Sequence, residues 1–345
     1  MSAEGRRNDD GTSGPIPVGV IGCGRMGRLH ARVYSEMPQV KLVGVYDASA
    51  DAASVTAADY GCRAAATIEE LLPQVKAVSI AVPTRIHADV AEACIARGVA
   101  CLVEKPLARD VAEGRRIADA ARRHGVIVQV GHIERFNPAV RAMGGLKVAP
   151  RFIESIRISP MTFRSIDVGV VLDMMIHDID IVLMLAQSPV RDIEAVGVSV
   201  IGQHEDICNA RLVFENGCVA NVTASRLALK TERKLRVFSG EAYVSVDYQK
   251  KHGVVVRRTG NLDAIRAAAD KIRRGDVQDL SALNYTDLVH VEELQISDTE
   301  PLRAQLDSFI TAVRNGTPPE VSAEDGLAAV ETATRIVKAM GQQAL

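Results

Sequence analysis

A glycine-rich turn near the beginning of the chain constrains its fold more than any other feature. In "VIGCGRMG", Gly22, Gly24 and Gly27 follow an apolar run and precede an amphipathic one. At this spacing the first glycine permits a tight turn, the second lets a phosphate approach the backbone, and the third lets helix and strand pack closely. The helix that follows directs free N–H groups toward the same place. The turn predicts a strand–turn–helix unit that binds a dinucleotide, with Arg25 and Met26 inside its loop.

The sequence around this turn alternates short apolar runs with amphipathic ones as far as Val130. The apolar runs are typical of buried parallel strands: "IPVGVIG", "VKLVGVYD", "AVSIAVP", "GVACLVEKP" and "GVIVQVG". The runs between them are typical of helices: "GRLHARVYSEM", "ADVAEACIARG" and "VAEGRRIADAARRHG". This alternation predicts a doubly wound parallel sheet, a Rossmann domain for the cofactor, over residues 16–133. Residues 1–15 are small and polar, so we expect a flexible tail there.

The pattern changes after about Gly131, where one apolar helix (roughly Val170–Leu185) is followed by consecutive strand-like runs. Among these, "FENGC" places an Asn-Gly turn between two alternating runs, which predicts a β-hairpin. We therefore expect residues 134–345 to form an α+β domain on a large, open and mostly antiparallel sheet. Further helices are expected over three segments: Leu262–Ser281 with a polar loop, Pro301–Asn315 and Ala323–Met340.

Composition excludes several classes of partner. The 345 residues include 41 Lys and Arg against 43 Asp and Glu, and a net charge of −2 gives no electrostatic reason to bind nucleic acid or an anionic membrane. The six cysteines form no C-x-x-C pair and lie in apolar contexts, which is typical of reduced thiols in a cytoplasmic protein. The polar N-terminus lacks the apolar core of a signal peptide, and no uncharged apolar stretch reaches the ~18 residues of a membrane span.

The second predicted strand ends in Asp47, within "GVYD". A carboxylate at this place accepts hydrogen bonds from the ribose 2′-OH of NAD and repels the 2′-phosphate of NADP. The residues that follow, Ala48 and Ser49, include no arginine that would hold such a phosphate. The sequence therefore favours NAD as the cofactor.

Lys105 lies in "LVEKPLA", at the end of the predicted strand "GVACLVEKP". This places it at the carboxyl edge of the sheet, where ligands of such sheets bind. A lysine there can hydrogen-bond a substrate hydroxyl and help relay its proton, although a surface lysine would fit the same position. We expect Glu104 to orient Lys105, Pro106 to fix the turn, and both Glu104 and Lys105 to line the cofactor site. A strand-to-helix turn beside the cofactor, rather than a proton relay, is expected for "PTRIH": Pro83, Thr84 and His87.

Charged residues interrupt the apolar helix "VVLDMMIHDIDIVLML". At ~100° per residue, Asp173, His177 and Asp180 fall within about 60° of one another, and Asp178 points elsewhere. The polar stripe has two interpretations. It belongs either to a helix whose charged side chains face solvent or form a buried ion pair, or to the wall of an active site. Oxidation of an alcohol needs a base near its proton, and histidine suits that role near neutral pH. His177 is thus the candidate base. A metal on Asp173 and His177 is disfavoured, because no third ligand is evident.

Taken together, these motifs make the chain resemble the glucose–fructose oxidoreductase/inositol dehydrogenase (Gfo/Idh/MocA) family. The resemblance covers nearly the whole chain and rests on "GVIGCGRMGRLHA", "AVPTRIHADVAEACIARGVACLVEKPLA", "VGHIERFNPA", "LDMMIHDIDI" and the closing helices. It implies a Rossmann domain and a C-terminal open-sheet domain. The family's catalytic lysine falls on Lys105, and its hydroxyl-binding carboxylate and proton-transferring histidine fall on Asp173 and His177. One departure is the single Gly169 before the helix, where many members carry a Gly-rich stretch.

"VGHIERFNPAV" together with "SIDVGVVLDMMIHDIDI" resembles the branch that oxidises C3 of UDP-N-acetylglucosamine. In that branch the 3-keto sugar passes to an aminotransferase and gives a 3-amino sugar for lipid A. Glu134, Arg135 and Asn137 follow the last Rossmann strand, so we expect them to line the substrate pocket, although they also fit a capped interdomain turn.

Two other enzymes stay open from the sequence alone, a dehydrogenase of the corresponding uronate and one of inositol or another polyol. Arg135 or Arg164 could serve the carboxylate of a uronate. A third possibility is a non-catalytic NAD-bound sensor, which would be expected to lack the lysine or the histidine. Helix Val170–Leu185 covers one face of the second sheet and little sequence is left for the other, so we expect a partner to bury that face. The resemblance implies the same, a dimer or tetramer formed through this sheet.

Overall fold

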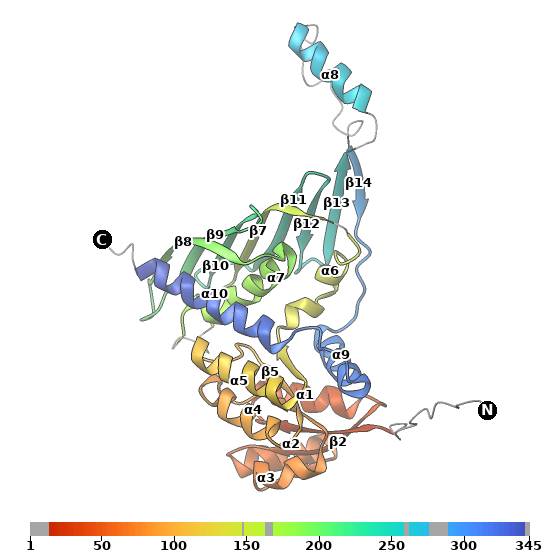
Figure 1. Ribbon diagram of the computed structural model, residues 1–345, viewed down its shortest axis with the longest axis vertical. Helices are drawn as coiled ribbons and strands as arrows, with labels where there is room; N and C mark the ends of the chain where they lie inside the picture. The colour runs from red at the N-terminus through yellow and green to blue at the C-terminus, as the bar shows by residue number, and fades with distance from the viewer. Residues whose placement is uncertain (1–13, 147, 163–167, 259–261, 276–288, 342–345) are drawn as a thin grey trace, which may run out of the picture. The chain divides into compact units, whose positions relative to one another are not determined.

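The computed structural model describes residues 14–146, 148–162, 168–258, 262–275 and 289–341. These residues divide into two compact units (Figure 1). The first lies within Met1–Gly131 and Leu302–Leu327, and the second within His132–Pro301 and Ala328–Leu345. The first unit thus ends at Gly131 and takes in Leu302–Leu327 again later in the chain. The functional domain bounds expected from the sequence, 16–133 and 134–345, stay a prediction.

The sheet of the first unit has six parallel strands in the order β3-β2-β1-β4-β5-β6, as a Rossmann fold requires. Its strands are β1 (Ile16–Ile21), β2 (Val40–Tyr46), β3 (Arg63–Ala64), β4 (Ala77–Ile80), β5 (Ala100–Glu104) and β6 (Val128–Gly131). Every residue of β4 and of β6 is buried, because helices cover the sheet on both faces. The expected doubly wound sheet is therefore confirmed.

Helices join these strands, and those over Arg25–Ser35, His87–Ile95 and Val111–His124 overlap the runs that the sequence predicts to be helical. The helices are α1 (Arg25–Ser35), α2 (Ala50–Tyr60), α3 (Ile68–Leu71), α4 (His87–Ile95) and α5 (Val111–His124), with short 3₁₀ turns η1 (Leu72–Gln74) and η2 (Thr84–Ile86). Local caps set several ends: the Asp110 side chain accepts a hydrogen bond from the Glu113 N–H at the start of α5, and Gly125 ends it in the left-handed conformation. From the C-terminal segment, α9 (Pro301–Asn315) packs with this unit.

The second unit is built on an eight-stranded sheet in the order β14-β13-β12-β11-β7-β10-β9-β8. Only the β10–β7 pair is parallel among the described strand pairs, so the mostly antiparallel sheet is confirmed. The strands are β7 (Pro150–Ile158), β8 (Val190–Val198), β9 (Ile207–Phe214), β10 (Val219–Ser225), β11 (Glu232–Ser239), β12 (Ala242–Asp247), β13 (His252–Arg258) and β14 (Val289–Glu293). The predicted Asn-Gly turn joins β9 to β10, with Gly217 at φ +83°.

Helices of this unit lie on one face of the sheet (Figure 1). They are the 3₁₀ turn η3 (Ile133–Phe136), α6 (Pro138–Arg141), η5 (Val171–Met175) and α7 (Ile176–Ala186), while α8 (Leu262–Arg274) follows β13 and α10 (Ala323–Gly341) closes the chain. The expected single α-helix over 170–185 is wrong in one respect, because η5 is a π-helix. Within the described residues, no helix is long and apolar enough to span a membrane. The expected tail lies largely outside the described residues.

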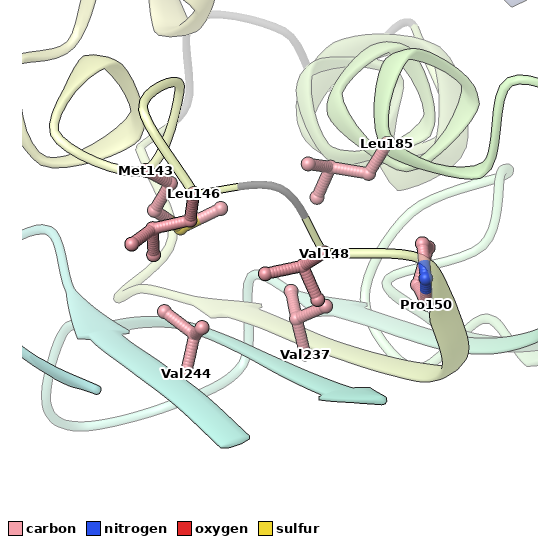
Figure 2. A pocket seen from close by; sticks show the side chains of 7 residues that line it. All are labelled: Met143, Leu146, Val148, Pro150, Leu185, Val237 and Val244. Atoms are coloured by element: carbon pink, nitrogen blue, oxygen red, sulfur yellow. The ribbon is translucent and has the colours of Figure 1, made fainter. Parts of the chain in front are cut away.

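A small apolar pocket of about 30 Å³ lies in the core of the second unit. Figure 2 shows Leu185 reaching down from α7 and Val237 and Val244 rising from the strands beneath it. Met143 and Leu146 close it from the segment after α6. The side chains that line this pocket are apolar, which identifies it as incomplete packing rather than a polar ligand site.

Candidate active site

The glycine turn of the first unit has the geometry that its spacing predicted. Gly22 has φ +99°, and a Cβ there would lie 2.5 Å from the carbonyl oxygen of Ala81. A Cβ on Gly27 would overlap the carbonyl oxygen of Gly22. A Cβ on Gly24, by contrast, would meet no atom within 4 Å, so this glycine borders open space. The turn is therefore closed where helix meets strand and open where a pyrophosphate would approach.

Asp47 ties the end of β2 to this turn. Its carboxylate accepts hydrogen bonds from the backbone N–H of Cys23 at 2.6 Å and of Ser49 at 2.8 Å. The side chain stays partly exposed, and each carboxylate oxygen can accept more than one hydrogen bond. Asp47 can therefore also accept hydrogen bonds from a ribose, so the residues present fit a bound NAD. Arg25 and Met26 open α1, where the helix leaves backbone N–H groups free for phosphates.

The residues of "PTRIH" form the turn that links β4 to α4. Pro83 and Thr84 follow β4, the neighbour of β1 in the sheet, so they lie at the edge that carries the glycine turn. His87 is buried, with Nδ1 3.0 Å from the carbonyl oxygen of Pro106 and Nε2 2.9 Å from that of Val82. Burial lowers the pKa of His87, and hydrogen bonds to these carbonyls oppose the shift. His87 thus joins two loops, and its contact with the cofactor stays a prediction.

Glu104 and Lys105 lie where β5 ends. The side chain of Glu104 is 12% exposed, and its Oε1 lies 2.9 Å from Nε2 of His30 on α1. Its Oε2 accepts the backbone N–H of Lys105 at 3.3 Å. Burial alone would raise the pKa of Glu104, but the hydrogen bond from His30 and the charges of His30 and Lys105 lower it overall. The carboxylate of Glu104 thus contacts the backbone of the lysine, and its expected role in orienting the Lys105 side chain stays a prediction.

The polar helix of the second unit sorts its charged side chains into two groups. Asp173 in η5 and His177 in α7 are partly exposed, whereas Asp178 and Asp180 are each 1% exposed. The angular estimate from an ideal α-helix does not hold across η5, because a π-helix has more residues per turn. Such π segments occur frequently at functional sites. Of these four residues, the two expected to do chemistry are therefore the two that solvent reaches.

Both buried carboxylates are paired with arginines. Asp180 accepts two hydrogen bonds from Arg135, from Nε at 2.8 Å and Nη2 at 2.7 Å. Asp178 accepts hydrogen bonds from Arg157 on β7 and, at 2.7 Å, from the hydroxyl of Ser155. The buried ion pair that was one interpretation of this helix therefore applies to Asp178 and Asp180. These pairs fix α7 on its neighbours on both sides of its backbone.

Glu134, Arg135 and Asn137 have partners inside the second unit. Glu134 accepts hydrogen bonds from Arg157 and from Asn137, each at 2.9 Å. Burial alone would raise the pKa of Glu134, but the charge and hydrogen bond of Arg157 lower it overall. Asn137 accepts the N–H of Ala139 and so caps α6. These contacts match the capped-turn interpretation, and direct contact of the three residues with substrate stays a prediction.

A further set of contacts, which the sequence did not reveal, holds the start of η5. Glu205 accepts the N–H of Val171 through its side chain and that of Val170 through its backbone carbonyl. A Cβ on Gly169 would overlap the Glu205 carboxylate, so this glycine has a packing reason to be there. Arg226 donates a hydrogen bond to the carbonyl oxygen of Val168 at 2.8 Å. The helix that carries Asp173 and His177 is therefore anchored at its beginning.

Metal binding has no support among the described residues, where no group of three or more His, Cys, Asp or Glu side chains is placed to hold an ion. Arg164, one candidate for a uronate carboxylate, lies outside the described residues.

Comparison with known sequences identifies the class of protein that these features define. Residues 16–132 match the oxidoreductase family with an NAD-binding Rossmann fold, and residues 158–244 match the GFO/IDH/MocA C-terminal domain. The chain belongs to the Gfo/Idh/MocA family of NAD-dependent oxidoreductases, as the sequence motifs indicated. Its cofactor is accordingly NAD.

Among its relatives, UDP-N-acetylglucosamine 3-dehydrogenase of Acidithiobacillus ferrooxidans is 39% identical over 232 residues, 67% of this chain and 74% of the relative. The solved structure of that enzyme, GnnA, superimposes with a TM-score of 0.84 at 31% identity, covering 95% of this chain and 98% of the other. Inositol 2-dehydrogenase of Rhizobium meliloti is 26% identical and covers 95% of this chain and 98% of its own length. The chain is thus similar to sugar and polyol dehydrogenases along most of its length.

Proposed function

We propose that the protein oxidises the 3-OH of UDP-N-acetylglucosamine to the 3-keto nucleotide sugar with NAD. The observation that carries this proposal is the 39% identity to the 3-dehydrogenase of A. ferrooxidans, well above the 26% identity to an inositol dehydrogenase. The TM-score of 0.84 with the same enzyme supports it further.

In the proposed reaction, each functional residue has one task. His177 takes the proton of the 3-OH as general base. Lys105, as an ammonium ion, stabilises the negative charge that grows on the same oxygen. Asp173 accepts a hydrogen bond from a neighbouring hydroxyl and so orients the sugar. Bound NAD supplies the acceptor for the hydride that leaves C3, so the overall products are the ketone, reduced NAD and one proton.

Two facts bear on the alternative substrates. A uronate calls for a free basic side chain near its carboxylate, whereas Arg135 already donates two hydrogen bonds to Asp180. Inositol stays the second candidate because an inositol dehydrogenase matches the chain over 95% of its length. A non-catalytic sensor is disfavoured by the presence of both Lys105 and His177.

We also propose that the protein is a homo-oligomer held together by the second sheet. On the side of the strands opposite the buried core residues, one row of paired residues is apolar across most of the sheet: Val213, Val219, Phe152, Phe238, Tyr243, Val256 and Val291. The rings of Phe152, Phe238 and Tyr243 stack along it at 5.6 and 4.8 Å between centroids. Apolar rows of this size are usually buried in a partner. Light scattering at micromolar concentration should therefore show a dimer or tetramer, and a monomer would contradict the proposal.

Chemistry suggests where the product goes. A 3-keto sugar is the substrate that an aminotransferase needs to make a 3-amino sugar, so we place the enzyme in the cytoplasm before such a step, in the supply of 3-amino sugars for lipid A or other glycans. Reduced thiols support this compartment, since none of the six described cysteines is in a disulfide.

An isotope experiment tests the substrate and the position together. UDP-N-acetylglucosamine deuterated at C3 should transfer its label to C4 of the nicotinamide, as measured by mass spectrometry of the reduced cofactor. The same substrate deuterated at C4 or C6 is the control and should transfer none. Label transfer from C4 or C6, or faster turnover of free inositol than of the nucleotide sugar, would reject the proposal.

A further inference from the structure

His30 is a buried histidine that no sequence motif singled out. It lies on α1, the helix that begins at the glycine turn, and is fully buried. Its Nε2 is 2.9 Å from Oε1 of Glu104, a residue of the neighbouring strand β5. Since Glu104 directly precedes Lys105, this contact joins the phosphate-binding helix to the strand end that carries the lysine.

The surroundings of His30 indicate which ring nitrogen carries the proton. Nδ1 is buried and has no hydrogen-bond partner among the described residues, so a proton there would be an unsatisfied buried donor, which is unfavourable. Nε2 faces a carboxylate oxygen and gains a charge-assisted hydrogen bond when it is protonated. We therefore assign the proton to Nε2. The ring edge is held against Tyr34, whose hydroxyl is 2.9 Å from that of Ser79.

Glu104 is enclosed on the other sides as well. A Cβ on Gly131, in the adjacent strand β6, would lie 3.0 Å from Oε1 of Glu104, so a larger residue there would press on the carboxylate. The charged or titratable groups that act on Glu104 are His30, Lys105 and His87. Of these, His87 has both ring nitrogens at hydrogen-bond distance from backbone carbonyl oxygens and not from Glu104. His30 is therefore the side chain that donates a hydrogen bond to the carboxylate beside the lysine.

We propose that His30 is a positioning residue that acts through Glu104 to keep Lys105 in its ammonium form, an inference that rests on the function proposed above. Lys105 can stabilise the developing alkoxide only while it is protonated. The Glu104 carboxylate, as long as it stays ionised, favours the positive charge of the neighbouring lysine and would offset the repulsion of a positive nicotinamide if bound NAD brought one close. A buried carboxylate that loses its hydrogen-bond donor is protonated more easily, and the lysine then loses its proton at lower pH.

The pH profile of kcat tests this chain of effects. His30→Leu removes the hydrogen-bond donor to Glu104. We expect the pH at which kcat falls on the alkaline side, the alkaline limb of the profile, to decrease by about one unit. His30→Gln places an amide N–H where Nε2 lay and should restore the limb of the native enzyme. Glu104→Gln keeps the volume but removes the charge, and should move the limb at least as far. In the Glu104→Gln background, His30→Leu should add no further shift.

A second measurement reads Lys105 without turnover. Reductive methylation with ¹³C-formaldehyde labels the lysines for NMR. The signal of Lys105 is identified as the one that is missing in Lys105→Arg, and its chemical shift is then followed against pH in the NAD complex. We expect this titration to move down in His30→Leu and Glu104→Gln and to be normal in His30→Gln. If both His30→Leu and Glu104→Gln lower thermal stability but leave titration and pH limb unchanged, His30 is only structural and the proposal is wrong. A shifted titration in a protein that fails to oxidise nucleotide sugars would overturn the proposed function alone.

Discussion

The two sheets of the molecule differ in how they meet their surroundings. In the first, all residues of β4 and the first four of β5 are buried, because a parallel sheet is covered by helices on both faces. In the second, β10 and β12 alternate buried and partly exposed residues along their length. The first sheet is thus covered on both faces within its own unit, whereas the second carries an apolar row on one face. The same chain therefore uses one sheet as a core and leaves one face of the other partly exposed.

The same contrast applies to the functional groups. The first unit holds Asp47 and Lys105 at strand ends, where backbone turns and local hydrogen bonds fix them. The second unit holds His177 on a helix whose neighbouring carboxylates are gripped by arginines from other elements. The position of the helix that carries His177 therefore depends on side chains that are far apart in the sequence. Substitutions in each unit can test these two modes of fixing functional side chains separately.

The largest effect is expected at His177, the proposed catalytic base. His177→Asn removes the proton acceptor but keeps a polar side chain of similar size. We expect kcat to fall by roughly 10²–10⁴-fold, the usual contribution of a positioned acid–base group. NAD affinity, measured by fluorescence quenching or calorimetry, should stay within twofold of the native protein because the substituted position lies outside the unit that holds the glycine turn. A kcat within threefold of the native enzyme would exclude His177 as the base.

The next effect tests the ion pairs that hold α7. Arg157→Met leaves the buried carboxylates of Glu134 and Asp178 without their shared cation, which should cost about 3–5 kcal/mol of unfolding free energy. Arg191→Met is a matched control, because the Arg191–Asp192 pair is exposed and such pairs contribute about 0–1 kcal/mol. Urea unfolding followed by circular dichroism measures both. Equal losses in the two variants would show that burial of the first pair does not matter.

A smaller effect concerns the choice of cofactor. If Asp47 contacts the ribose as proposed, kcat/KM should favour NAD over NADP by about 10- to 100-fold, since a close pair of like charges near a surface costs on the order of 1–4 kcal/mol. Asp47→Ser should narrow the ratio. Asp51→Ser, an exposed acid in the first turn of α2, should leave it unchanged. Equal kcat/KM for the two cofactors in the native enzyme would refute this assignment.

The smallest effect lies in the apolar pocket of the second unit. Val244→Ile adds one methyl group to a space of about 30 Å³, which should stabilise the protein by up to ~0.7 kcal/mol. Val246→Ile adds the same group on the same side of β12 but away from the pocket, and overpacking should destabilise by about 1–3 kcal/mol there. Thermal unfolding distinguishes the two. A destabilising Val244→Ile would mean that the pocket cannot accept the added methyl.

Sequence patterns were most informative where structure is local. Gly22, Gly24 and Gly27 predicted their turn because each role depends on the backbone of the turn itself. The parallel sheet followed from unbroken apolar runs, and the hairpin of the second sheet followed from an Asn-Gly pair. The alanine-rich α2 was not predicted, because its sequence has no clear apolar stripe.

Patterns were least informative where partners are distant in the chain. Nothing in the sequence around Arg157 or Glu205 signals that one holds Asp178 and the other caps the start of η5. The π-helix at Asp173 was likewise missed, since apolar periodicity over five residues does not distinguish it from an α-helix. His30 reads as one more position on the buried face of α1 until the structure brings Glu104 to it.

The return of Leu302–Leu327 to the first unit has a consequence for biosynthesis. The edge strand β6 receives its outer contacts from this late segment: the N–H of Val130 donates to the carbonyl oxygen of Val321, and Gln129 pairs with Ser322. During translation, the nascent Rossmann sheet therefore keeps an open edge until nearly the whole chain has left the ribosome. Open sheet edges invite pairing with other chains, so this period is when the protein most needs a chaperone.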